Sequence, residues 1–449
     1  MEAIRVQDNM LLNGKISTVF LKFAVPAIVA MLISGMQTMV YGLFVGNILG
    51  PNAMASVNIS NPFVQLIMGI SFIVSVGTQS YMGLNLGNKN IEKAQNVFKT
   101  SIIFILIMGE SITLLGLIFN EKLAILLGAN DVLVKDVSTY IKMIAIFTIP
   151  INLMLLFGFS NRIIEKPELY FRGMILSLFT NIVLNYILTA KLNLGIVGTA
   201  TATGCSFLAA FMVVVWPMLD KKSVINIFVG KFDKSVIYPM LYNGSSEGIN
   251  SISTATCAYL FNMAFMNIAG EGGVAAFTSI NYIAQFGILL MFGISDGICP
   301  IVSYNYGSKQ YDRVDKILKL AFKICIVAGI FIFVTLFFFG KDLVELFVKG
   351  NNDIISLSAS GAKVYAFAFF MNGFNIVNSG YFTAIGNARS SVIVAASRGL
   401  LFIIIGIVML PMIFGVSGVW MSVPFAEVCT FFIGFYLTYK SSKSICINI

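Results

Sequence analysis

Four acidic residues lie inside long apolar stretches of this sequence: Glu110, Glu247, Asp296 and Glu427. An ionised side chain at membrane depth costs roughly 2.5 to 3.5 kcal/mol on insertion scales, so such an acid is a functional hypothesis by default. Burial favours the neutral acid, whereas an approaching cation favours the carboxylate. The chemistry available to these residues is therefore the exchange of a proton for another cation.

Glu247 is the strongest of the four candidates. Its surroundings, "YNGSSEGINSIST", supply small hydroxylated residues and glycines that are typical of a cavity lining. The alternative is a carboxyl group that joins helices by hydrogen bonds. Asp296 falls near the expected cytoplasmic end of its stretch, where a structural role is as consistent as a functional one. Glu110 and Glu427 lack comparable polar neighbours in the sequence, so a structural role is favoured for both.

Other polar side chains are expected within the same apolar stretches. Asn181 and Asn185 are one helical turn apart and present two amides on one face, where they could coordinate an ion or join helices. Arg398 could reach toward a membrane interface or pair with an acid. Five further residues are candidates for lining a cavity or ion site, namely Tyr41, Gln37, Thr203, Asn372 and Gln285.

Several function classes are disfavoured by what the sequence lacks. It has no histidine, and its six cysteines show no CxxC spacing, so we expect no metal site. A nucleophile paired with a base is equally hard to assemble, and we predict no enzymatic activity. No GxxxxGK[ST] motif indicates ATP binding. We therefore expect no cofactor, and an ion gradient of H⁺ or Na⁺ as the source of energy.

The elements that must position these residues are membrane-spanning helices. Hydrophobic residues make up 58% of the 449 residues and charged residues 11%, with a mean hydropathy of +0.89. A spanning helix needs roughly 20 mostly apolar residues. We predict an all-α integral membrane protein with twelve spans. The first six are expected at 16–45, 53–82, 94–119, 136–160, 168–190 and 196–218, and the second six at 236–266, 273–305, 316–340, 357–384, 390–413 and 416–439.

The positive charges support this count. With a cytoplasmic N-terminus, 22 of the 29 Lys and Arg residues fall on the cytoplasmic side, as the positive-inside rule requires. We expect a multi-pass plasma-membrane protein with both termini cytoplasmic, in contact with the lipid bilayer and with no nucleic-acid partner despite its net charge of +9. The expected domains are an N-terminal lobe at 1–219, a cytoplasmic linker at 220–235 and a C-terminal lobe at 236–449.

The two halves are similar to each other. With a fixed shift of 220, residues 50–99 match residues 270–319 at eleven positions, where chance gives about four. An even number of spans per copy lets both copies enter the membrane from the same side. This predicts two pseudo-symmetric six-helix bundles around a central cleft, which is typical of a secondary transporter that works by alternating access.

Several segments resemble the multidrug and toxic compound extrusion (MATE) transporters, and the similarity covers essentially the whole chain. They include "FVGNILGPNAMASVNISNP", "GTQSYMGLNLGNKNIEKA", "NIVLNYILTAKLNLGIVGTATAT", "GISDGICPIVSYNYGSKQYDRV" and "FGVSGVWMSVP". The resemblance implies two six-helix bundles that export lipophilic organic cations by antiport with protons or sodium.

The resemblance also bears on individual residues. Glu247 falls where one branch of the family carries a glutamate in the seventh span, and Asn181 matches the asparagine of another branch in the fifth. Where many members have aspartates, this chain has Tyr41 in the first span, Asn185 in the fifth and Asn372 in the tenth. Glu247 is then the one acid that matches the family pattern.

Two readings of the substrate stay open. The leading one is the export of small lipophilic cations by a monomer. The alternative is a flippase of the same superfamily that moves a lipid-linked saccharide or a lipid headgroup. A flippase of that kind should place several Arg or Lys side chains in the cleft to bind phosphate, and few basic residues fall within the predicted spans, which favours the exporter.

Overall fold

The computed structural model describes residues 10–345 and 352–447, apart from the side chains of Tyr41, Leu43, Asn352 and residues 444–447. Every regular element in this part of the chain is a helix, as predicted. The side chain of Tyr41, one of the predicted cavity residues, lies outside the described residues.

The α-helices are α1 Met10–Asn13, α2 Ile16–Phe44, α3 Pro51–Gly87, α4 Ile91–Ile118, α5 Asn120–Leu126, α6 Val134–Ile146, α7 Thr148–Ile163, α8 Pro167–Leu184, α9 Gly195–Val215, α10 Ile237–Gly307, α11 Tyr311–Glu345, α12 Asn352–Ala366, α13 Phe369–Ala384, α14 Ala388–Ala396, α15 Phe402–Phe414 and α16 Val416–Ile447. Wider π turns continue three of them, at η2 Val45–Leu49, η3 Asn185–Lys191 and η6 Ser397–Leu401. Two short 3₁₀ turns, η4 Trp216–Leu219 and η5 Lys234–Val236, flank the connection before α10.

The span count agrees with the prediction. Within the described ranges, nine helices are long and apolar enough to cross a membrane, and two bent pairs, α6 with α7 and α12 with α13, each supply one more. Helix α10 has 71 residues and supplies two spans rather than one, because its backbone leaves the helical conformation at Gly270. That brings the total to twelve.

Two predicted spans are bent rather than straight. The span predicted at 136–160 bends by 49° between α6 and α7, where Pro150 in the first turn of α7 has no N–H to continue the preceding helix. The span predicted at 357–384 bends by 53° between α12 and α13. No proline stands there, and the backbone of Phe369 packs directly against Gly329 of α11.

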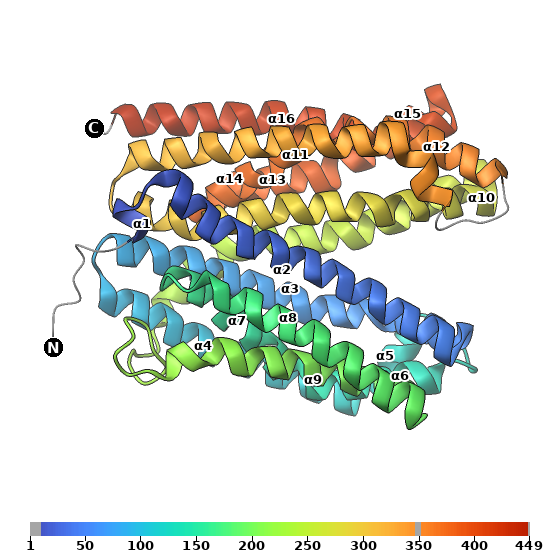
Figure 1. Cartoon of the computed structure of the whole chain (residues 1–449), viewed down its shortest axis with the longest axis horizontal. Helices are drawn as coiled ribbons and strands as arrows, with labels where there is room; N and C mark the ends of the chain where they lie inside the picture. Colours follow the sequence, from blue (N-terminus) through green and yellow to red (C-terminus); the bar gives the residue numbers. More distant parts are fainter. Residues whose placement is uncertain (1–9, 346–351, 448–449) are drawn as a thin grey trace. The chain divides into compact units, whose positions relative to one another are not determined.

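Contacts divide the chain into two compact units. The N-terminal unit runs to Gly244 and includes Ser303–Lys309, and the C-terminal unit comprises Ser245–Val302 and the chain from Gln310 onward. Helix α10 therefore contributes to both. Within the N-terminal unit α8 and α9 lie side by side, and within the C-terminal unit α13 packs against α11 and α16 (Figure 1).

Each unit has an aromatic core. In the N-terminal unit Phe98 and Phe157 meet edge to face with their ring centroids 5.5 Å apart. In the C-terminal unit Phe265 lies 4.5 Å from Trp420. Many large apolar side chains instead face outward, such as Phe331 at 70% exposure. A surface of this kind requires a hydrocarbon environment rather than water, so this is a multi-pass membrane protein.

The connection between η4 and α10 is docked on α4 of the same unit. The side-chain amide of Gln95 donates to the carbonyl of Asn226, and Lys99 donates to the carbonyl of Ile227 at 2.9 Å. The backbone N–H of Asp233 donates to Thr100 at 2.9 Å. These polar contacts hold the segment against the helix rather than leaving it as a free tether.

The sequence repeat is also visible in the backbone. Gly50 and Gly270, which the shift of 220 pairs, have φ values of 86° and 62° with extended ψ. Gly195 and Gly415 both have a φ of 57°. Each copy therefore breaks its helices at the same places, in conformations that favour glycine.

The two repeat-paired turns give a test of this backbone constraint. A Cβ atom at Gly50 or Gly270 would meet no atom within 4 Å, so the cost of Gly50→Ala or Gly270→Ala comes from the backbone conformation alone. We expect each to lower stability by about 1 to 3 kcal/mol, seen as a lower melting temperature in detergent. Gly42→Ala in α2, also free of neighbours but helical, is the control and should not lower it.

Candidate functional site

A cavity inside the C-terminal unit contains the best acidic candidate of the sequence. Its volume is about 260 Å³ including the part that is open to the outside, and its centre has room for about one water molecule. Glu247 of α10 lines it together with Asn250 and Ser295 of the same helix, Asn375 and Ser379 of α13, and Arg398 of η6. Every lining residue belongs to this one unit.

Glu247 is partly buried and weakly compensated. Among the described residues, the one hydrogen bond to its carboxylate comes from Asn250 at 3.4 Å, which is near the limit of a useful hydrogen bond. Asp296 and Arg398 act on it electrostatically with opposite signs. The carboxylate therefore keeps most of its capacity to accept a proton or a cation.

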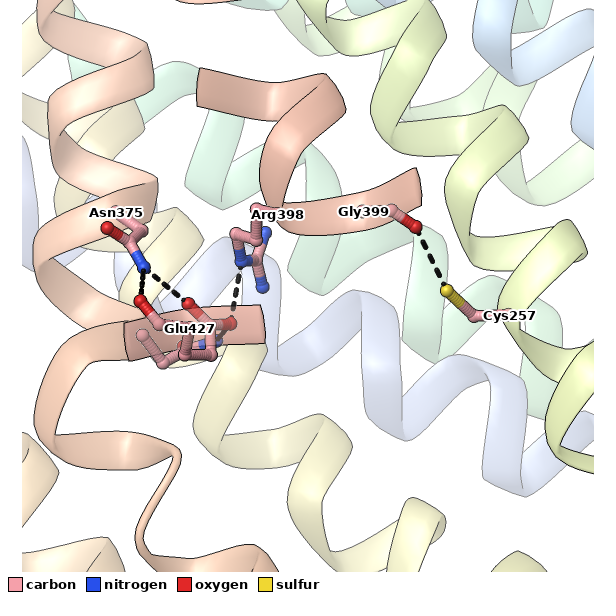
Figure 2. Close-up of polar contacts among 6 residues, drawn as sticks. Cys257, Asn375, Arg398, Gly399 and Glu427 are labelled. Atoms are coloured by element: carbon pink, nitrogen blue, oxygen red, sulfur yellow. Dashed lines mark hydrogen bonds and ion pairs between the residues drawn. The ribbon is translucent and has the colours of Figure 1, made fainter. Parts of the chain in front are cut away.

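Glu427 of α16 lies in a different environment, in which hydrogen-bond donors contact both oxygens of its carboxylate (Figure 2). Its Oε1 accepts a hydrogen bond from Asn372 at 2.7 Å and pairs with Nε of Arg398 at 2.9 Å. Its Oε2 accepts one from Asn375 at 2.7 Å. Only an ionised carboxylate can accept all three without also presenting a donor. The buried negative charge is thus matched by one positive charge and two amides.

Local structure brings these partners together. Asn372 and Asn375 are three residues apart in α13 and therefore share one face of the helix. Arg398 stands in the π turn η6. Figure 2 shows the next residue, Gly399, accepting a hydrogen bond from Cys257 at 3.1 Å. A Cβ atom at Gly399 would collide with Ser253, so the turn carrying Arg398 lies directly against α10.

The N-terminal unit holds a second buried polar cluster, and it contains no carboxylate among the described residues. The amide of Gln37 donates to Ser177 and Ser206 at 3.4 and 3.3 Å. The amide of Asn181 donates to Thr203 at 3.4 Å, and Asn185 donates to Asn181 at 3.1 Å. Four of the predicted polar residues therefore gather here, and they join α2, α8, η3 and α9.

The remaining candidates are placed differently. Asp296 is partly buried on α10, on the same helix as Glu247. Gln285 is exposed on α10 and is not among the residues that line the cavity. Glu110 is exposed on α4, in a shallow groove with Leu106 and Ile107.

Sequence reasoning did not identify the partners of Glu427 and missed Asn375. Glu427 lacks polar neighbours close in the sequence, but the fold supplies them from distant parts of the chain. Of the two roles left open for Arg398, the pairing with an acid is the observed one. A signal for Asn375 was present: asparagines recur at 372, 375 and 378 in "MNGFNIVNSG", and this spacing predicts a polar stripe on one helix face.

Comparison with known proteins identifies relatives along the full chain. The multidrug export protein MepA of Staphylococcus aureus is 25% identical over 427 residues, which cover 94% of each chain. MepA of Staphylococcus haemolyticus is 24% identical and covers 99% of this chain and 98% of its own.

Solved structures show the same fold. The outward-facing conformation of a multidrug resistance MATE family transporter superposes with a TM-score of 0.91 at 21% identity, covering 97% of this chain and 98% of the other. A crystal structure of MATE in complex with MaL6 gives 0.91 at 22% identity with the same coverage. The family model MatE matches residues 26–187 and 249–412, which is most of the chain and falls on both halves. The resemblance seen in the sequence is thereby confirmed, and the chain belongs to the MatE family of membrane transporters.

Proposed function

We propose that this transporter exports small lipophilic organic cations in exchange for H⁺ or Na⁺, and that Glu247 is the residue at which the ion and the substrate compete. The observation that carries the proposal is the environment of Glu247. It is a carboxylate on a membrane-spanning helix, beside a cavity, with one long hydrogen bond from Asn250. The multidrug export function named for the MepA relatives is consistent with it.

Mutual exclusion at one carboxylate is sufficient for antiport. A protonated Glu247 has no charge with which to attract a cationic substrate, and an ionised Glu247 needs a cation for compensation. Entry of the coupling ion from outside therefore displaces the substrate, and release of the ion inside restores the negative site. Exchange of one monovalent ion for one monovalent cation is electroneutral, so one pH unit supplies about 1.4 kcal/mol, or roughly a tenfold substrate gradient.

The charges near the cavity favour a cationic substrate over a phosphate-bearing lipid. Three acids, Glu247, Asp296 and Glu427, act in this region, against the single guanidinium of Arg398. That guanidinium pairs with Glu427 through one of its three nitrogens. Acids therefore outnumber basic side chains here, whereas a flippase should present several Arg or Lys donors to a lipid phosphate.

Neutralising Glu247 tests the proposal directly. With the protein reconstituted in liposomes, ethidium transport is measured under a pH gradient and under a sodium gradient imposed separately. The wild type should respond to at least one of them, with a gradient of about tenfold per pH unit if the ion is a proton. Glu247→Gln should abolish the coupled component. Glu110→Gln, which changes an exposed acid on α4, is the matched control and should transport like the wild type. Coupled transport unchanged in Glu247→Gln would end the proposal.

We further propose that the protein is a plasma-membrane monomer with lobes at 1–219 and 236–449 joined by a cytoplasmic segment at 220–235. Both termini are then cytoplasmic. The sorting of Lys and Arg between alternate connections supports this orientation of the termini.

Single cysteines on two exposed lysines test this orientation. In a background without the native cysteines, Lys122→Cys on α5 should react with a membrane-impermeant maleimide on intact cells. Lys222→Cys in the connection before α10 should react only after permeabilisation. Both lysines are exposed, so access to the reagent and not burial decides the result. The reverse pattern would place the termini outside.

A further inference from the structure

Arg398 uses one of its three guanidinium nitrogens in the buried ion pair. Its Nε contacts Oε1 of Glu427 at 2.9 Å. Within the part of the chain that the structure describes, its two terminal nitrogens make no hydrogen bond or ion pair. The side chain keeps 16% of its surface exposed, against 4% for Glu427. The two terminal nitrogens of the guanidinium group therefore have access to open space.

That open space is the cavity beside Glu247. Arg398, Glu247 and Phe292 all line it, and the guanidinium centre lies 5.8 Å from the ring centroid of Phe292. Arginine keeps its charge under all ordinary conditions. A permanent positive charge thus stands in the same cavity as the carboxylate that receives the coupling ion.

Three other ionisable groups lie within electrostatic range of Glu247 or Arg398. Asp296 acts electrostatically on Glu247 and adds a second negative charge. Tyr365 of α12 and Cys257 of α10 lie within electrostatic range of Arg398, and both are neutral when protonated. Among the described residues, Glu427 is the one ion-pair partner of Arg398.

We propose that Arg398 is the resident cation of this cavity and sets the affinity of Glu247 for the coupling ion and for cationic substrates. Glu427 is the positioning residue that holds Arg398 at a fixed place, with Asn372 and Asn375 fixing Glu427 in turn. The inference rests on the function proposed above and adds to it a residue that tunes the exchange site through charge. A purely structural ion pair would have no such effect on binding.

The proposal requires that replacing Arg398 and replacing Glu427 change the affinity for cations in opposite directions. Replacing Arg398 removes a positive charge beside Glu247, so cations should bind more tightly. Replacing Glu427 leaves the charge of Arg398 uncompensated and free to approach Glu247, so cations should bind more weakly. A unit charge at several ångströms in a medium of intermediate dielectric changes a binding constant by about tenfold or more. Replacing both should bring the affinity back between the two extremes.

The experiment measures the dissociation constant of tetraphenylphosphonium on purified full-length protein in detergent, at fixed pH and sodium concentration. Arg398→Gln should lower the constant by about tenfold and Glu427→Gln should raise it by about tenfold. The double variant should fall between them. Only folded, monodisperse protein is used. If Glu427→Gln does not fold, the comparison of Arg398→Gln with Arg398→Lys replaces it. Lysine keeps the charge and should stay within about threefold of wild type.

Any of three results would overturn the inference. These are shifts of the same sign in the two single variants, no shift in Arg398→Gln, or equal dissociation constants for Arg398→Lys and Arg398→Gln. The underlying function is tested separately by Glu247→Gln in the same assay. Loss of tetraphenylphosphonium binding there, with no shift in the Arg398 variants, would refute the role of Arg398 while leaving the proposed exchange intact.

Discussion

Compensation of buried negative charge is the constraint on which the C-terminal unit depends. Taking a carboxylate out of water costs several kcal/mol unless a cation or strong donors replace its hydration. Glu427 obtains this compensation from Arg398, Asn372 and Asn375, so α13, η6 and α16 meet at one point. Glu247 receives one hydrogen bond among the described residues, from Asn250 at 3.4 Å. One acid is therefore compensated within the fold to a much greater extent than the other. We propose that this difference is what allows Glu247 to exchange its partner.

The two copies of the repeat share a backbone plan and differ in this chemistry. Their helices break at paired positions, such as Gly50 with Gly270. The described polar cluster of the N-terminal unit is built from amides and hydroxyl groups around Gln37 and Asn181, which form hydrogen bonds with one another without a charge. A neutral cluster joins helices at little electrostatic cost, whereas a charged one can hold an ion. We propose that an ion entering the protein is therefore attracted most strongly to the C-terminal unit.

The sequence predicted the fold well because lipid leaves the backbone few choices. Every N–H and C=O group must be satisfied within a helix, so hydropathy reports the spans directly, and the shift of 220 between halves located the paired turns. Glu247 was recognised because its polar neighbours, among them Asn250, are close in sequence. The polar partners of Glu427 were not identified, because Asn372, Asn375 and Arg398 lie 55, 52 and 29 residues away and only the folded chain brings them together. The bend before Phe369 was likewise hidden, since no proline marks it.

The central claim is that the coupling ion and a positively charged substrate compete for one carboxylate, that of Glu247. A competition experiment at equilibrium tests this claim most directly. The dissociation constant of tetraphenylphosphonium for the wild-type protein is measured while the proton and sodium concentrations are varied independently. The account predicts that the constant rises tenfold for each tenfold increase in at least one of these ions, once that ion saturates the site. A constant that is independent of both ions would contradict it.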